Sequence, residues 1–171
     1  MNDIIDFILQ QTKNVLAIDS PTGFTSRAAD YVMEEYRKLG YAPVRTNKGG
    51  ILVCVSEGNG AAPCGPEEGP ILLEAHIDTL GAMVSEVRAN GRLSVTPLGG
   101  MNPNNGEAEN CRIYTREGKV YDGTFQLKNA SVHVNGEYST TARSYDTMEV
   151  VLDEEVSDRE GVLSLGILPG D

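Results

Sequence analysis

The sequence of 171 residues predicts an α/β fold, with helices packed on a sheet, followed by a small β-rich segment. Two observations lead to this prediction. Apolar residues recur at helical spacing in the first forty positions, whereas later stretches carry apolar runs and alternating patterns separated by Gly, Pro and Asn. A hydrophobic content of 40% is normal for a chain that buries a core.

Two helices are expected at the start of the chain. The first should span residues 3–17, and the second should begin with Thr25 or Ser26 as N-cap and end before Gly40, a residue type that ends helices by adopting positive φ. Each helix should bury one apolar face against the sheet. The expected inner residues are Ile4, Ile5, Ile8, Thr12, Val15 and Leu16 in the first helix, and Ala28, Val32, Tyr36 and Leu39 in the second.

Three strands should form the sheet, at residues 41–46, 51–55 and 71–75. The last two are nearly continuous apolar runs, which are typical of strands that are covered on both faces. Residues 58–69 between them are rich in Gly, Pro and Ala, and this composition predicts a surface loop.

After Asp78 the pattern changes to short alternating strands. Asn90-Gly91 predicts a tight hairpin turn because both residues tolerate positive φ, and Glu117-Gly118 is expected to act in the same manner. The expected strands are Met83–Val87, Leu93–Val95, Cys111–Thr115, Lys119–Tyr121, Ser131–Val134 and Met148–Leu152.

A short helix should close the sequence. Ser157 and Glu160 have the spacing of a capping box, in which the two side chains satisfy backbone donors at a helix start. The helix is therefore expected to run from Ser157 to Leu165, before Pro169-Gly170.

Charge and composition exclude several classes of function. Fourteen Lys and Arg against twenty-five Asp and Glu give a net charge of −11, which repels nucleic acid and anionic lipid. No apolar run reaches the roughly 18 to 20 residues of a membrane helix, and Asp3 and Asp6 stand where a signal peptide carries positive charge. We therefore expect a cytoplasmic protein with neither nucleic-acid nor membrane partners. Its three cysteines, Cys54, Cys64 and Cys111, lack a CxxC spacing and are expected to be free thiols.

The most informative motif is His76-Ile77-Asp78, at the end of the third expected strand. Residues i and i+2 of a strand point to the same face, so the imidazole and the carboxylate should emerge together. Ligands of open α/β sheets bind beyond the carboxyl ends of strands. A carboxylate beside a His can fix the ring while the other ring nitrogen binds a metal. His76 is thus a candidate metal ligand and Asp78 its partner, although such a triplet also occurs at an ordinary capped strand end.

The order of elements resembles that of the tetrahedral and glutamyl aminopeptidases. The similarity covers nearly all of the chain, and its most specific parts are the flanks of His76 and the closing segment. The stretch from Asn102 to Asn110 departs from the family pattern because it is unusually rich in Asn. The matching motifs are Ser20–Gly23, Leu39–Tyr41, Asn47–Gly50, Ala75–Gly81, Pro97–Gly100, Tyr114–Val120, Ser131–His133 and Gly166–Asp171.

This resemblance implies a fold and an activity. It implies part of an α/β catalytic domain at residues 1–80, a β-barrel or PDZ-like insert that drives homo-oligomerisation at 81–166, and the return to the catalytic domain at 167–171. It also implies two divalent metal ions, zinc or cobalt with manganese as a further possibility, and cleavage of N-terminal residues from short peptides. By resemblance His76 matches the first metal ligand, and Asp78 matches the catalytic-site carboxylate that orients it.

Other candidates for the site are weaker. His133 lies in the β-rich half and is interpreted as structural, and the pairs Glu154-Glu155 and Glu67-Glu68 are interpreted as solvated turn residues. A catalytic zinc takes about three protein ligands, so the remaining ligands and the general base are expected beyond residue 171. We therefore expect a portion of a longer protein that is catalytically incomplete alone and binds metal weakly or not at all.

Two other functions stay open from the sequence. The β-rich half could serve as a non-catalytic oligomerisation module or bind a peptide along a strand edge. A related metal-dependent deacylase or carboxypeptidase is a third interpretation, because a His-x-Asp triplet after a buried strand also occurs in such enzymes. Metal content and the effect of His76→Ala distinguish the enzymes from the assembly module.

Overall fold

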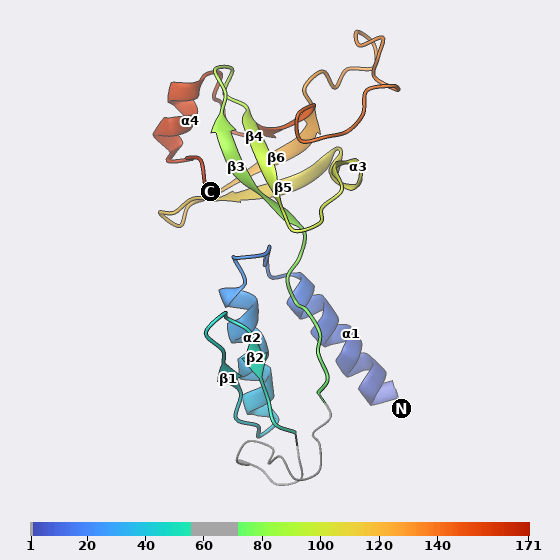
Figure 1. Ribbon diagram of the computed structural model, residues 1–171, viewed down its shortest axis with the longest axis vertical. Helices are drawn as coiled ribbons and strands as arrows, with labels where there is room; N and C mark the ends of the chain where they lie inside the picture. The colour runs from blue at the N-terminus through green and yellow to red at the C-terminus, as the bar shows by residue number, and fades with distance from the viewer. Residues whose placement is uncertain (1, 56–71) are drawn as a thin grey trace. The chain divides into compact units, whose positions relative to one another are not determined.

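The computed structural model describes residues 2–55 and 72–171 of the chain. The chain divides into two compact units, Met1–Thr79 and Leu80–Asp171. Figure 1 shows the elements of each unit in chain order. Among the described residues, no helix is long and apolar enough to cross a membrane, and the expected cytoplasmic location stays a prediction.

The first unit contains two helices, α1 (Asn2–Leu16) and α2 (Ser26–Lys38), which confirms both expected helices. Thr25 is the N-cap of α2, although its side chain makes no capping hydrogen bond. Gly40 follows the helix with a φ of 87°, the left-handed conformation that suits Gly at a helix end. The helix buries the small side chains Ala28 and Ala29.

The apolar face of α1 is exposed, which contradicts its expected burial. Ile4 is 66% exposed and Ile8 is 55% exposed. Polar side chains join the two helices instead: the Tyr31 hydroxyl donates to Gln11 Oε1 at 2.7 Å and accepts from Asn14 Nδ2 at 2.8 Å. The described residues thus leave the apolar stripe of α1 uncovered. Of the other residues expected inside, Ile5, Thr12, Leu16 and Leu39 are also exposed, whereas Val15, Val32 and Tyr36 are half-buried.

The sheet of the first unit is smaller than expected. Strands β1 (Val44–Arg45) and β2 (Ile51–Leu52) pair antiparallel, and each is shorter than its predicted run. The expected strand at 71–75 is wrong for its described part, because residues 72–78 form no strand and Leu73 is 88% exposed. Within the described ranges this segment has only the isolated parallel bridge Pro21↔Thr79, so no ladder forms. The predicted loop at 58–69 lies outside the described residues.

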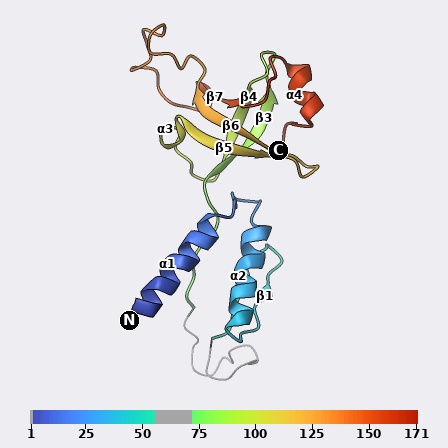
Figure 2. The same cartoon turned by 180° about the vertical axis from the view of Figure 1, so that it is seen from behind.

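The second unit is a curled, five-stranded antiparallel sheet in the order β3-β4-β7-β6-β5 (Figures 1 and 2). Both expected hairpins are confirmed, with Gly91 at a φ of 74° and Gly118 at 83°. A β-bulge lies between Val84 and Glu86. The strands are β3 (Gly81–Val87), β4 (Leu93–Leu98), β5 (Glu109–Tyr114), β6 (Val120–Leu127) and β7 (Met148–Leu152).

The core of this unit lies on one face of the sheet. Leu93, Met148 and Ile167 are fully buried there, and Phe125 packs among them. The backbone of the closing segment also joins β3, because Gly170 N donates to Val84 O at 2.8 Å and Val84 N donates to Asp171 O at 2.7 Å. These bonds cover β3 at its bulge.

A short helix, α4 (Arg159–Leu165), confirms the expected final helix but not its cap. The N-cap is Asp158, whose carboxylate accepts from Gly161 N at 2.8 Å. The predicted capping box of Ser157 and Glu160 is therefore wrong, because the N-cap lies one residue later. Asp is as favourable as Ser at an N-cap because its side chain also accepts a hydrogen bond from a backbone N–H of the first turn.

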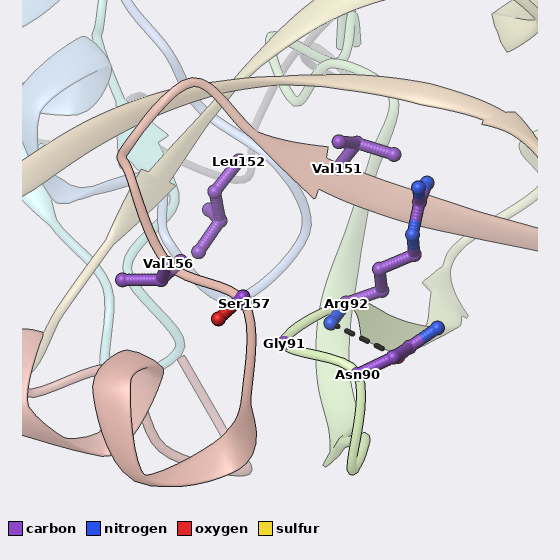
Figure 3. A pocket seen from close by; sticks show the side chains of 7 residues that line it. All are labelled: Asn90, Gly91, Arg92, Val151, Leu152, Val156 and Ser157. Carbon is purple, nitrogen blue, oxygen red and sulfur yellow. Dashed lines mark hydrogen bonds between the residues drawn. The ribbon is translucent and has the colours of Figure 1, made fainter.

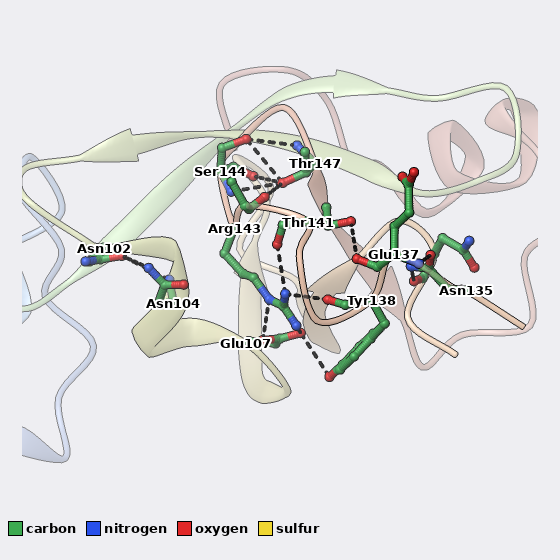
Figure 4. Close-up of polar contacts among 12 residues, drawn as sticks. Asn102, Asn104, Glu107, Asn135, Glu137, Tyr138, Thr141, Arg143, Ser144 and Thr147 are labelled. Atoms are coloured by element: carbon green, nitrogen blue, oxygen red, sulfur yellow. Dashed lines mark hydrogen bonds and ion pairs between the residues drawn. The ribbon is translucent and has the colours of Figure 1, made fainter. Parts of the chain in front are cut away.

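The segment between β6 and β7 contains turns, so the strand predicted at Ser131–Val134 is wrong. A polar network holds this segment instead (Figure 4). The Arg143 guanidinium makes a two-pronged ion pair with Glu107, at 2.8 and 2.9 Å, and donates to the carbonyls of Tyr138 and Thr141 at 2.7 and 2.8 Å. These contacts satisfy backbone acceptors that a strand partner would otherwise bind.

The Asn-rich stretch before β5 has a local structural use. Asn102 is the N-cap of the one-turn helix α3 (Pro103–Gly106), and its side chain accepts from Asn104 N at 3.0 Å. Asn favours this position because its short side chain reaches a helix-end donor.

Gly123 is the glycine that the sheet requires most strictly. A Cβ at this position of β6 would lie 2.6 Å from the carbonyl oxygen of Val151 in β7 and 3.1 Å from Val150 Cγ1. Backbone oxygen cannot move away without breaking the ladder, so a side chain here strains the centre of the sheet.

We predict that Gly123→Ala lowers the free energy of unfolding of the second unit by roughly 1–3 kcal/mol, the usual cost of overpacking. Urea denaturation followed by circular dichroism measures this change. Gly100→Ala is the matched control because nothing lies within 4 Å of a Cβ there. Equal stability of the two variants would contradict the steric argument.

Candidate functional site

Two segments of the first unit meet around the predicted site. The Ser20 hydroxyl, which is fully buried, donates to the carbonyl of Ile77 at 3.0 Å. The backbone N–H of Thr79 donates to the carbonyl of Ser20 at 2.9 Å. The turn that begins at Ser20 is thereby fixed against the chain that carries His76 and Asp78.

His76 and Asp78 lie together, although no strand carries them. His76 Nδ1 is 3.1 Å from Asp78 Oδ1 and 3.2 Å from the backbone oxygen of Asp78. The imidazole is 85% exposed and the carboxylate 37% exposed. Because one ring nitrogen faces the carboxylate, the rest of the exposed ring is open to a ligand.

Thr22 completes this arrangement. Its Oγ1 donates to Asp78 Oδ2 at 2.7 Å, so the two carboxylate oxygens have different partners. This hydrogen bond is the main cause that lowers the pKa of Asp78 below its ordinary value; the residue's own backbone N–H and His76 lower it further, against desolvation. The carboxylate therefore stays ionised and can orient the imidazole.

Sequence reasoning missed the role of Thr22. Ser20–Gly23 stands out in the sequence only as a motif that matches the family pattern, whereas the Thr22 hydroxyl meets a carboxylate 56 residues away. No local pattern specifies a contact over that separation.

The other candidates belong to the second unit or lie outside the described residues. His133 is exposed in a turn of the second unit, and Glu154 and Glu155 are exposed after β7. Glu67-Glu68 lies outside the described residues. Within residues 2–55 and 72–171, no group of three or more His, Cys, Asp or Glu side chains could hold a metal ion.

The chemistry of the pair suits one part of a metal site. An imidazole that is oriented by a carboxylate is a common arrangement around protein-bound zinc. A catalytic zinc needs about three protein ligands, and the described residues supply one imidazole with its carboxylate. His76 and Asp78 therefore fit as part of a donor set, not as the whole of it.

Comparison with known proteins identifies the class. The model of the M42 glutamyl aminopeptidase family matches residues 58–171, and the chain belongs to this family. The Bacillus subtilis (strain 168) protein YhfE, whose name marks it as a candidate aminopeptidase, is 36% identical over 163 residues. The glutamyl aminopeptidase of Lactococcus lactis subsp. cremoris is 33% identical over 112 residues, which are 66% of this chain and 30% of that protein.

Solved structures show the same fold. The aminopeptidase APDkam598 from the archaeon Desulfurococcus kamchatkensis matches with a TM-score of 0.75 and 23% identity, over 95% of this chain and 41% of its own. The TET1 peptidase of Pyrococcus horikoshii matches with a TM-score of 0.71 and 20% identity, over 95% and 44%. The match to YhfE covers 95% of this chain and 45% of that protein, so the chain spans about half the length of such relatives.

We predict that Thr22→Val raises the pKa of Asp78 toward its ordinary value because the strongest hydrogen bond to the ionised form is lost. A carboxyl with a lowered folded pKa stabilises the fold above its unfolded pKa, and this contribution is lost as the pH falls through the folded value. Titration of the carboxyl carbon by NMR measures the shift. Thr22→Ser keeps the hydroxyl and should titrate as the parent does; a pKa that is unchanged in Thr22→Val would refute the assignment.

Proposed function

We propose that this chain forms the N-terminal part of a metal-dependent aminopeptidase, in which His76 is a metal ligand and Asp78 orients its ring. The observation that carries the proposal is the 3.1 Å contact between His76 Nδ1 and Asp78 Oδ1 in a member of the M42 family. Thr22 supports it by holding the second carboxylate oxygen, so the ring faces a fixed and ionised partner.

Bound metal would supply an activated water and polarise the peptide carbonyl. The work of the described residues is to position a donor. Thr22 holds Asp78, Asp78 holds the imidazole, and the buried Ser20 anchors the segment that carries both. The identity of the metal, with zinc or cobalt expected, and the number of ions belong to this proposal.

The second unit is proposed to be the insert through which copies of the protein associate, with short peptides as substrates. The TET1 peptidase of Pyrococcus horikoshii, which has the same fold, can assemble into a tetrahedron or a large octahedral shell. Similar self-association of this chain is part of the proposal. The alternative is a module that assembles without catalysis, for which the separate β-rich unit is the favouring observation.

Metal titration tests the ligand role directly. We predict that the 171-residue chain binds zinc or cobalt weakly in calorimetry, because one imidazole and a carboxylate leave the coordination sphere open. His76→Ala should abolish this binding. His133→Ala is the matched control, since it removes the other histidine of the chain from an exposed turn. Binding that survives in His76→Ala would remove His76 from the site.

Activity tests the proposed reaction. We predict negligible hydrolysis of aminoacyl anilides by the 171-residue chain alone, measured by the released aniline. When the chain is extended to the length of its relatives, hydrolysis should appear, and Asp78→Asn should reduce it roughly 10- to 100-fold, as expected for a partner of a metal-bound His. If the protein at the extended length binds no metal and shows no hydrolysis, and if His76→Ala changes neither result, the assembly module would be favoured.

A further inference from the structure

The closing segment ends in a tight turn at the outer edge of β3, the edge that does not face β4. Asp171 N donates to the carbonyl of Leu168 at 3.2 Å, and Pro169 and Gly170 lie between them, with Gly170 at a φ of 96°. A Pro followed by a residue of positive φ is typical of a type II turn. The chain therefore reverses direction at this edge.

Gly170 and Asp171 form a β-bulge opposite Val84. Gly170 N donates to Val84 O at 2.8 Å, and Val84 N donates to Asp171 O at 2.7 Å. Two residues thus face one, and the first of them is a Gly of positive φ, which is the arrangement of a G1 bulge in an antiparallel pair. These bonds set both direction and register, so residues that follow Asp171 would run antiparallel to β3, toward Leu80.

The next residue of β3 that faces this edge is Ala82. In an antiparallel pair, alternate residues direct both backbone groups toward the neighbouring strand, and the residues between them direct theirs away. Val84 directs its N–H and C=O to the closing segment, so Ala82, two residues earlier, directs its own to the same side. The register agrees, because Ala82 lies opposite Pro97 of β4, which has no N–H to donate. Among the described residues, none bonds to Ala82 at this outer edge.

The other half of β3 is covered by the end of the chain. Arg159 Nη2 of α4 lies 3.3 Å from Glu86 Oε1. At the β3–β4 turn, a Cβ on Gly91 would lie 3.2 Å from Ser157 C, so this turn packs against the segment that follows β7 (Figure 3). Within the described ranges, the part of the outer edge that is left open is therefore residues 80–83.

Asp171 brings an unsatisfied acceptor to the start of this open edge. Its side chain is fully buried, and its Oδ2 accepts from Leu168 N at 2.9 Å. Its Oδ1 lies 3.5 Å from Arg116 Nε but makes no hydrogen bond within the described part of the chain. A buried acceptor without a donor is costly, so this oxygen fits a structure in which further backbone N–H groups lie beside it.

We propose that the open edge of β3 receives a sixth strand, formed by the residues that follow Asp171 in the full-length protein. The inference rests on the proposed function, in which this chain is the N-terminal part of a longer enzyme. In the register set at Val84, the second residue after Asp171 lies opposite Ala82 and exchanges both backbone hydrogen bonds with it. The fourth lies opposite Leu80, where the second unit begins. The added strand thus brings the chain back to a point two residues from Asp78 in the sequence.

A second copy of the chain is the competing occupant of this edge. The continuation of the same chain is favoured because it is tethered in register by the Gly170 bulge, which gives it a high effective concentration at the edge. The length of the relatives provides for such a continuation, since the matched part of YhfE is 45% of that protein.

Amide hydrogen exchange of Ala82, followed by NMR, tests the added strand. Two metal-free proteins are compared: the 171-residue chain, and the same chain extended by the six residues that follow Asp171 in the full-length protein. We expect Ala82 to exchange at least roughly 100-fold more slowly in the extended chain, because its N–H gains a partner there. Met83 is the internal control, since its N–H faces β4 and should be equally protected in both proteins.

Two proline variants of the extended chain test the register. A proline at the second position after Asp171 lacks the N–H that bonds Ala82 O and places its ring against β3, so it should abolish the added protection of Ala82. A proline at the first position is the matched control, because the N–H that it removes points away from β3. Protection of Met83 that is unchanged in both variants reports that the five-stranded sheet is intact.

Three results would overturn the proposal. They are equally fast exchange of Ala82 in the two chain lengths, equal protection of Ala82 in the two proline variants, and protection in the 171-residue chain that rises with protein concentration. The last result would assign the edge to a second copy. The exchange experiment needs neither metal nor substrate. An added strand in a protein that binds no metal would therefore contradict the proposed function alone, and an unpaired Ala82 in an active enzyme would contradict this inference alone.

Discussion

The candidate site depends on the hydrogen bonds between the Ser20 turn and the segment that ends at Thr79. His76 is not held by a sheet, so its position relative to the rest of the first unit comes from the Ser20 hydroxyl on Ile77 and the Thr79 N–H on Ser20. Ser20 is fully buried, and a buried hydroxyl without its acceptor would be costly. The same turn places Thr22 beside Asp78. One short segment therefore both anchors the chain that carries His76 and holds the Asp78 carboxylate.

The second unit differs from the first because it has a large hydrophobic core and a buried charged side chain. β7 lies in the middle of the strand order and carries Glu149 at 2% exposure beside Arg88 and Arg92. Burial raises the pKa of Glu149, and the two guanidinium groups act against that rise. A buried carboxylate of this kind is weak evidence for net stability, since desolvation offsets much of the attraction. Its effect is to hold two cations at one place on the sheet.

Much of the second unit could be predicted from the sequence, because its signals are local. Hairpins at Gly91 and Gly118 need positive φ, and the alternating runs beside them give the strands. The predictions failed where the deciding contact was distant. The segment between β6 and β7 is held in part by the Arg143 ion pair with Glu107, 36 residues apart, and no period in the sequence reports that pair.

The first unit shows a second limit of sequence reasoning. Helical spacing placed α1 correctly, but an apolar stripe does not say what covers it, and the continuous apolar run at Leu72-Leu73 did not make a strand. At the site, the i and i+2 spacing correctly predicted that His76 and Asp78 are neighbours. The reason for that prediction was wrong, since the contact forms without a strand. The supporting hydroxyl of Thr22 required the folded chain.

The uncovered stripe of α1 also bears on how the protein behaves in solution. The exposed apolar side chains of Ile4, Ile8 and Leu16 favour association between molecules. The charge of −11 opposes this by mutual repulsion. Salt screens that repulsion, with a Debye length of about 3 Å at 1 M. It does not weaken the contact between apolar side chains. Raising the ionic strength therefore weakens the repulsion that opposes association through the exposed apolar stripe.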